Sequence, residues 1–273
     1  MPVKLRVFIV RHGETAANKD GTIQGQLDTE LNEEGLRQAR LLAEKMKETP
    51  IHIAYSSDLI RAKKTAEIVL EHDPGVVLHE RKELRERFMG TLEGTRVPGI
   101  ARQAIMRSDK TIETTEQLGR RALAWWDEVI KHVEKNKNTS KAGGEGLELE
   151  VADANSLESA AQTTNILVTS HGGTISTFFN AGLAQGRLEL GPGVVFTRCW
   201  NTSVSIVEVD EKRRGRVTQY ADVSHLAKEQ VRVTNADEVE IDARGVEEQD
   251  VPSAVTVSWR AEPIDSRPHS RNT

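Results

Sequence analysis

The sequence predicts a three-layer αβα fold around a mostly parallel central sheet. Residues 5–10 and 166–170 are short apolar runs, rich in β-branched residues, of the kind found in strands that are buried on both faces. Segments with helical periodicity alternate with strand-like segments along the rest of the chain. This alternation is typical of parallel strands whose connecting helices cover both faces of one sheet.

The chain is expected to begin with a strand, a loop, a helix and a second strand. Residues 5–10 form the first strand, and the glycine-containing residues 18–28 form the loop. Asn32 is a good N-cap for a helix over residues 33–47, in which apolar side chains recur on one face. Residues 51–55 form the second strand.

A second helix is expected over residues 59–71, because Ser56-Ser57-Asp58 offers N-cap side chains just before it. A short strand follows near residues 76–79. Residues 83–90 are mostly polar and end in glycine, so we expect an irregular loop there. A short helix is expected over residues 100–107.

Helices and strands also alternate in the second half of the chain. Apolar side chains at helical spacing predict a long helix over residues 115–135. The buried strand over residues 166–170 leads through two glycines into a helix over residues 174–184. Two further strands are expected, over residues 202–209 and 217–221.

Two polar segments are expected to add length without adding to the core. Residues 136–164 have the composition of a solvated insertion, and residues 228–273 that of an acidic, disordered tail. The sequence therefore predicts one domain over residues 1–227, which carries the insertion and is followed by the tail.

Composition excludes several classes of protein. The net charge of −5 gives no reason to expect a nucleic-acid partner. No stretch approaches the roughly 20 apolar residues of a membrane span, so no membrane partner is expected. The single cysteine, Cys199, cannot form an intramolecular disulfide and fits a reducing compartment. We expect a cytoplasmic protein, with the nucleus as an alternative, and leave the oligomeric state open.

Two of the predicted strands end in histidine. Arg11 and His12 follow the strand over residues 5–10, and His171 follows the strand over residues 166–170. In open α/β sheets, ligands bind at the carboxyl ends of the strands. If these two strands are neighbours, both imidazoles converge on one crevice.

These residue types suit a phosphoryl group, which carries about two negative charges at neutral pH. Arg11 and Arg61 can each donate paired hydrogen bonds to its oxygens, and the Gly172 N–H, at the start of a helix, adds a backbone donor. Neutral His12 can attack phosphorus, and His171 can stabilise charge on the equatorial oxygens. Arg61 lies in the first turn of a predicted helix, where a cation opposes the helix dipole and needs another reason to be present.

Several separated motifs occur in an order that resembles a known family. They are Arg11-His12-Gly13-Glu14-Thr15, Ser56-Ser57-Asp58-Leu59 with Arg61, Leu84-Arg85-Glu86-Arg87 with Gly90, Ser170-His171-Gly172-Gly173, and Asn201-Thr202-Ser203-Val204. The pattern resembles the histidine phosphatase superfamily in its phosphoglycerate mutase-like branch, over about residues 4–226 without the insertion.

The resemblance implies a phosphatase that uses no metal or other cofactor and acts on small phosphate esters. It also implies a role for each matching residue. His12 would form the phosphohistidine; Arg11, Arg61 and His171 would hold the phosphoryl group; Glu86 would be the general acid and then the base; and Asn18, Gln24 and Gly25 would line the substrate pocket.

Two features of the sequence depart from the family. Gln117 stands where an acid is common near the start of the long helix. Residues 95–115 hold four basic residues, fewer than true mutases use to grip a bisphosphate. These departures favour hydrolysis over mutase activity. Two alternatives stay open, a phosphoglycerate mutase and a catalytically inactive domain that binds phosphorylated ligands. Glu86 could also belong to a solvated charge cluster with its neighbours.

Overall fold

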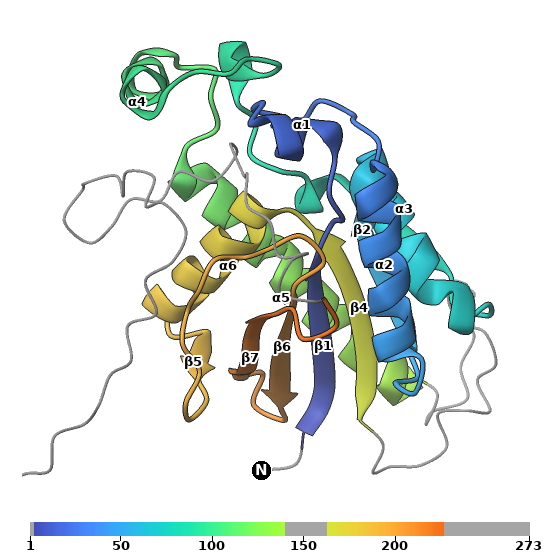
Figure 1. Ribbon diagram of the computed structural model, residues 1–273. Helices are drawn as coiled ribbons and strands as arrows, with labels where there is room; N and C mark the ends of the chain where they lie inside the picture. Colours follow the sequence, from blue (N-terminus) through green and yellow to red (C-terminus); the bar gives the residue numbers. More distant parts are fainter. Residues whose placement is uncertain (1–2, 140–162, 227–273) are drawn as a thin grey trace, which may run out of the picture. The chain divides into compact units, whose positions relative to one another are not determined.

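A computed structural model describes residues 3–139 and 163–226 of the chain, and Figure 1 shows how their helices and strands are arranged. Seven strands form one sheet in the order β3-β2-β4-β1-β6-β7-β5. The strands are β1 (Val3–Arg11), β2 (Ile53–Ser57), β3 (Leu78–Arg81), β4 (Thr164–Ser170), β5 (Leu188–Leu190), β6 (Val204–Asp210) and β7 (Gly215–Asp222).

The sheet is mostly parallel, as predicted. β3, β2, β4 and β1 pair in parallel, and β5 pairs in parallel with β7. β6 is antiparallel to both of its neighbours, β1 and β7, so it runs against the other described strands. In the central pair, Arg11 at the end of β1 lies opposite Ser170 at the end of β4.

Helices cover both faces of this sheet. The helices of the described residues are α1 (Ala16–Asp20), α2 (Glu33–Met46), α3 (Ile60–Val69), α4 (Gly99–Ser108), α5 (Thr115–Thr139) and α6 (Gly172–Ala184), with short 3-10 turns η1 (Leu70–His72), η2 (Lys82–Leu84) and η3 (Gly90–Leu92). Figure 1 shows α2 and α3 side by side, and these two helices contact each other.

Alternate side chains of β1 belong to different hydrophobic cores. Val7 and Ile9 share one core with Trp126 of α5 and apolar residues of α6. Phe8 shares the other core with Leu42 of α2 and Val69 of α3. Because successive side chains of a strand point to opposite faces, this division puts α5 and α6 on one face and α2 and α3 on the other. The predicted three-layer αβα architecture is confirmed.

The structure corrects several predicted boundaries. The predicted loop over residues 18–28 begins inside α1, which starts at a capping box formed by Thr15 and Asn18. β5 was not predicted, because three residues are too few to show a periodicity. The strands expected at 51–55 and 76–79 lie two residues later, since β2 ends on two buried serines that look like a polar boundary in the sequence.

The ends of the predicted insertion are also corrected. α5 continues to Thr139 and β4 begins at Thr164, so the first residues of the segment 136–164 are helical. Residues 140–162 and the predicted tail, 228–273, lie outside the described residues. Among residues 3–139 and 163–226, no helix is both long and apolar enough to cross a bilayer.

Gln117 serves as a helix cap. Its side-chain oxygen accepts a hydrogen bond from the Thr114 N–H at 2.8 Å, and its own N–H lies 3.2 Å from the Thr114 hydroxyl. This reciprocal pair is a capping box at the start of α5, which glutamine completes as well as an acid does. The departure at Gln117 therefore has a structural explanation.

Candidate active site

Two histidines meet at the carboxyl ends of the central strands. His12 directly follows β1, and His171 directly follows β4. Because these strands are parallel neighbours, the two imidazole rings lie together, with their centroids 5.1 Å apart and their planes inclined at 58°. Both side chains are buried. The predicted convergence of the imidazoles is confirmed.

The hydrogen bond of His12 determines which ring nitrogen can react. Nδ1 lies 2.7 Å from the carbonyl oxygen of Gly13. A carbonyl can only accept, so Nδ1 carries the proton and Nε2 keeps a lone pair. Burial, followed by the charges of Arg61 and Arg11, holds the pKa of His12 well below its ordinary value. His12 is therefore a neutral imidazole, which is the nucleophilic form.

His171 is held by a hydrogen-bonding side chain of β2. Its Nε2 atom lies 2.8 Å from the hydroxyl of Ser57, the last residue of β2. Its Nδ1 atom is buried and has no hydrogen-bond partner within the described part of the chain. Burial, followed by electrostatic coupling to Arg61, His12, Arg11 and Arg121, holds the pKa of His171 well below its ordinary value.

Both predicted phosphate-binding arginines are buried at this site. Arg11 donates from Nη1 to the carbonyl of Cys199 at 2.6 Å. Arg61 donates from Nη1 to the carbonyl of Leu27 at 2.7 Å and from Nη2 to that of Gly25 at 2.8 Å. A guanidinium has five N–H donors, so such anchoring is compatible with binding an anion through the same group.

The backbone of Gly25 thus anchors Arg61. Its φ angle is +50°, and a Cβ atom there would lie 2.2 Å from the Glu93 carboxylate. A side chain at this position would therefore be both strained and crowded. Asp28 accepts a hydrogen bond from the Ile60 N–H at 2.7 Å, which places a negative charge at the helix start that Arg61 occupies.

Glu86 is buried, which argues against the solvated charge cluster. Its Oε1 atom accepts hydrogen bonds from the Arg87 N–H at 2.8 Å and from the Thr174 hydroxyl at 3.3 Å. Its Oε2 atom accepts one from the Gly173 N–H at 2.9 Å. A Cβ at Gly173 would lie 2.6 Å from Oε1, so the close approach depends on glycine. The carboxylate is thereby held on the first turn of α6, directly after His171.

Asn18 and Gln24 belong to a buried network around Thr15. The Thr15 hydroxyl lies 3.1 Å from Oδ1 of Asn18 and 2.9 Å from Oε1 of Gln24. Asn201 links this network to the nucleophile, because its Nδ2 atom donates to the His12 carbonyl at 3.0 Å and lies 3.4 Å from Oδ1 of Asn18. A direct role for Asn18 or Gln24 in lining the pocket stays a prediction.

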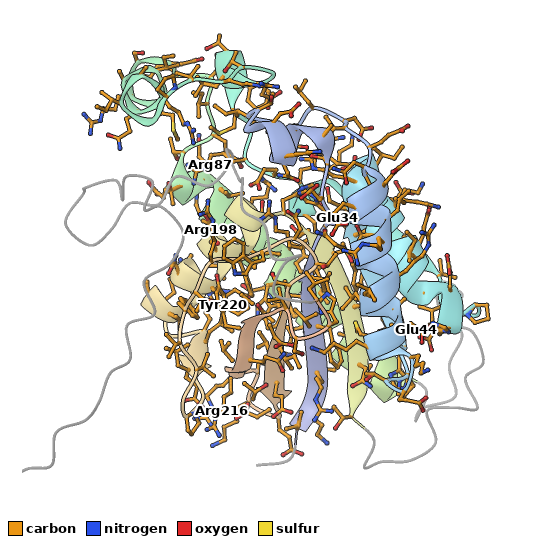
Figure 2. The ribbon with its side chains drawn as sticks, viewed as in Figure 1. Glu34, Glu44, Arg87, Arg198, Arg216 and Tyr220 are labelled. Atoms are coloured by element: carbon orange, nitrogen blue, oxygen red, sulfur yellow. The ribbon has the colours of Figure 1, made fainter. Side chains whose placement is uncertain are left out.

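The sequence assigned no active-site role to Ser57, Asn201 or Thr202. The N–H of Thr202 lies 3.1 Å from the Arg11 carbonyl and 3.3 Å from the His12 carbonyl, and the residue adopts a φ of +55°. The signal in the sequence for this contact is the motif over residues 201–204. Figure 2 shows Arg87 toward the end of the sheet at which β1 and β4 finish, and Arg216 toward the opposite end.

Comparison with known proteins identifies the domain. Residues 7–139 match the family model described as histidine phosphatase superfamily (branch 1). The chain contains a histidine phosphatase superfamily domain. A probable phosphatase from Schizosaccharomyces pombe is 29% identical over 234 residues, which cover 83% of this chain and 97% of the relative. A metal-independent phosphoserine phosphatase from Arabidopsis thaliana is 29% identical over 237 residues, which cover 81% and 83%.

Solved structures agree on the fold of this histidine phosphatase domain. A phosphoglycerate mutase from Bacillus anthracis superposes with a TM-score of 0.62 at 22% identity, over 82% of this chain and 96% of the mutase. At this identity the likeness concerns the fold alone. The family match and the named phosphatase relatives, not this likeness, identify the chain as a phosphatase of this superfamily, and hence as a phosphoric monoester hydrolase.

The neutral histidines make a prediction about stability. In the unfolded chain His12 and His171 titrate near 6.5, whereas in the folded protein their pKa values are much lower. Below pH 6.5 the unfolded state therefore binds more protons, so the free energy of unfolding should fall as the pH drops below 6.5, by up to about 1.4 kcal/mol per pH unit for each histidine.

Urea unfolding of the wild type and of a His12→Asn variant between pH 7.5 and 5.5 measures this contribution. The difference between the two proteins cancels the carboxylates and the histidines other than His171, whose pKa is coupled to His12. We expect the variant to lose less stability than the wild type over this range. An identical pH dependence in both proteins would mean that folding does not lower the pKa of His12.

Proposed function

We propose that this phosphatase hydrolyses small phosphate monoesters without a metal ion, through a phosphohistidine on Nε2 of His12. The observation that carries the proposal is the bond from Nδ1 of His12 to the Gly13 carbonyl, which leaves the Nε2 lone pair of a neutral, buried imidazole among Arg11, Arg61 and His171. The metal-independent phosphoserine phosphatase among the relatives supports both the absence of a metal and a small ester substrate.

In the first half-reaction, Nε2 of His12 attacks phosphorus. The Nε2–P bond forms and the P–O bond to the alcohol breaks, while Glu86 transfers a proton to the leaving oxygen. The charge on the equatorial oxygens of the phosphoryl group is stabilised by Arg11, by Arg61 and by the ring edge of His171 that carries Nδ1.

In the second half-reaction, water replaces the alcohol. The Glu86 carboxylate takes a proton from the water, whose oxygen attacks phosphorus. The Nε2–P bond then breaks, inorganic phosphate leaves, and both neutral His12 and protonated Glu86 are restored. His12 is carried by the end of a central strand, and the carboxylate of Glu86 is held by a hydrogen bond from the first turn of α6.

A phosphoglycerate mutase is the second candidate, because one of the similar folds is a named mutase. A mutase must exclude water and grip two anionic groups at once. The few basic residues of the segment 95–115 are not assembled for this task. Arg96 pairs with Asp20 at 3.0 Å, and Lys110 donates to the Arg107 carbonyl at 3.4 Å. These contacts favour water as the phosphoryl acceptor.

We expect phosphate release or no reaction when the protein receives 3-phosphoglycerate with a trace of 2,3-bisphosphoglycerate. The measurement follows 2-phosphoglycerate and free phosphate together, and a parallel assay follows para-nitrophenyl phosphate in excess chelator. Turnover of the nitrophenyl ester in chelator would reject both an inactive binding domain and a metal requirement. Fast interconversion of the phosphoglycerates with little free phosphate would instead identify a mutase.

A further inference from the structure

We infer that Arg121 and Glu113 form a positioning pair that fixes Glu86 in its place for proton transfer. The inference deepens the proposed function and rests on the role of Glu86 proposed there. Neither residue is among those predicted from the sequence to act in the site. Both side chains are mostly buried, with 21% of Arg121 and 16% of Glu113 exposed.

Arg121, on the second turn of α5, holds the main chain of residues 83–88, here called the Glu86 segment. Its Nη1 atom donates to the carbonyl oxygens of Glu83 at 2.7 Å and Arg85 at 2.9 Å. Its Nη2 atom lies 3.4 Å from the carbonyl oxygen of Glu86 itself. One guanidinium thus reaches three carbonyls of the segment that carries the general acid.

Glu113 contacts the segment on the other side of Glu86. Its carboxylate accepts paired hydrogen bonds from Arg121, at 2.9 Å from Nε and 2.7 Å from Nη2. The same carboxylate accepts a hydrogen bond from the Phe88 N–H at 3.2 Å, and the Glu113 N–H donates to the Phe88 carbonyl at 2.9 Å. The pair therefore holds the main chain both before and after Glu86.

The Glu86 segment depends on such side chains because it belongs to no strand. Its carbonyls must find donors elsewhere, since a buried carbonyl without a partner is costly. Ser170 donates to the Leu84 carbonyl at 2.7 Å, and Thr174 donates to the Arg85 carbonyl at 2.8 Å. These two donors flank His171 in the sequence, and Arg121 supplies further donors from α5.

The position of the carboxylate follows from the position of this main chain. A shift of about 1 Å in a reacting group can cost roughly 100-fold in rate. Loss of the pair should therefore impair proton donation by Glu86 and leave the attack by His12 largely intact. The chain offers a matched control in Arg120, which pairs with Glu116 at 2.6 Å, with both side chains more than half exposed.

The test compares the variants Arg121→Gln, Arg120→Gln and Glu86→Gln with the double variant Arg121→Gln/Glu86→Gln. Each is assayed for kcat on an alkyl phosphate, whose alcohol is a poor leaving group, and on para-nitrophenyl phosphate. We expect Arg121→Gln to lower kcat on the alkyl ester by about 10- to 100-fold and on the nitrophenyl ester by less than about threefold. Arg120→Gln should match the wild type on both esters.

In the Glu86→Gln background, Arg121→Gln should add almost no further loss, because a positioning residue has nothing left to position. Provided that Glu86→Gln itself slows the alkyl ester selectively, two results would overturn the inference. One is an equal loss of kcat on both esters in Arg121→Gln. The other is a full additional loss of kcat when Arg121→Gln is added to Glu86→Gln. If Glu86→Gln itself lacked that selectivity, the proposed role of Glu86 would fail and the inference with it.

Two further variants separate geometry from charge and from folding. Arg121 also contributes to the low pKa of His171, so Arg121→Lys keeps the charge but loses the planar fork. Positioning predicts that Arg121→Lys shows the same selective loss, whereas recovery of wild-type kcat on the alkyl ester would assign an electrostatic role instead. If Arg121→Gln does not fold, Glu113→Gln, which keeps the shape of the side chain, should show the same selective loss, and an unselective loss would overturn the inference.

Discussion

Replacing His12 by alanine should lower kcat on para-nitrophenyl phosphate by roughly 10⁴-fold or more, because the nucleophile cannot be replaced by its neighbours. His171 lies close, with the ring centroids 5.1 Å apart, but Ser57 holds its Nε2 atom. Steady-state kinetics with a sensitive phosphate assay measure the loss. Binding of inorganic phosphate should persist, since Arg11 and Arg61 are unchanged.

His72→Ala is the matched control for this variant. His72 lies in η1, is 38% exposed in its side chain and contacts Glu44, so its removal should leave kcat unchanged. If His12→Ala kept more than about a hundredth of the wild-type kcat, a different nucleophile or direct attack by water would carry the reaction. Matched melting temperatures of the wild type and both variants would show that folding does not account for the difference.

Glu86→Gln is expected to slow esters with poor leaving groups by roughly 10²–10⁴-fold, which is the usual contribution of a general acid. Glutamine keeps the size of the side chain and can still accept a hydrogen bond from the Gly173 N–H, but it cannot give up a proton. A nitrophenolate leaves without protonation, so nitrophenyl phosphate should lose much less. The measurement is kcat for a series of phosphate esters against the pKa of their alcohols.

Glu83→Gln is the control for Glu86→Gln. Glu83 lies three residues earlier and its side chain is exposed, so this charge should not affect leaving-group dependence. A steep dependence of kcat on leaving-group pKa is expected for Glu86→Gln only. Equal losses on alkyl and nitrophenyl esters would remove Glu86 from the role of general acid.

The pairing of the two histidines could be predicted because it depends on simple rules. Two apolar runs each ended in histidine, and parallel neighbours bring their carboxyl ends to one edge of a sheet. The identity of the reactive nitrogen could not be predicted, because it depends on the 2.7 Å contact with the Gly13 carbonyl. That contact arises from the local turn of the chain, which the sequence pattern does not specify.

The burial of Glu86 also could not be predicted from the sequence. Its charged neighbours resemble a solvated surface, but Arg85 pairs with Asp58, and Arg121 and Glu113 hold the main chain around Glu86. These contacts join residues that are far apart in the chain and follow no helical or strand period. The short elements α1 and β5 could not be predicted from the sequence either, because the periodicity of apolar residues is weak over three to five residues.

The central claim of the proposed mechanism is that a phosphoryl group becomes bound to His12 during the reaction. A brief reaction with labelled substrate in excess chelator, quenched in alkali within milliseconds and followed by peptide mapping, tests it. We predict a base-stable, acid-labile phosphoryl group on the peptide that contains His12, and none in the His12→Ala variant. A label on His171 or any other residue, or a label that persists in His12→Ala, would contradict the account.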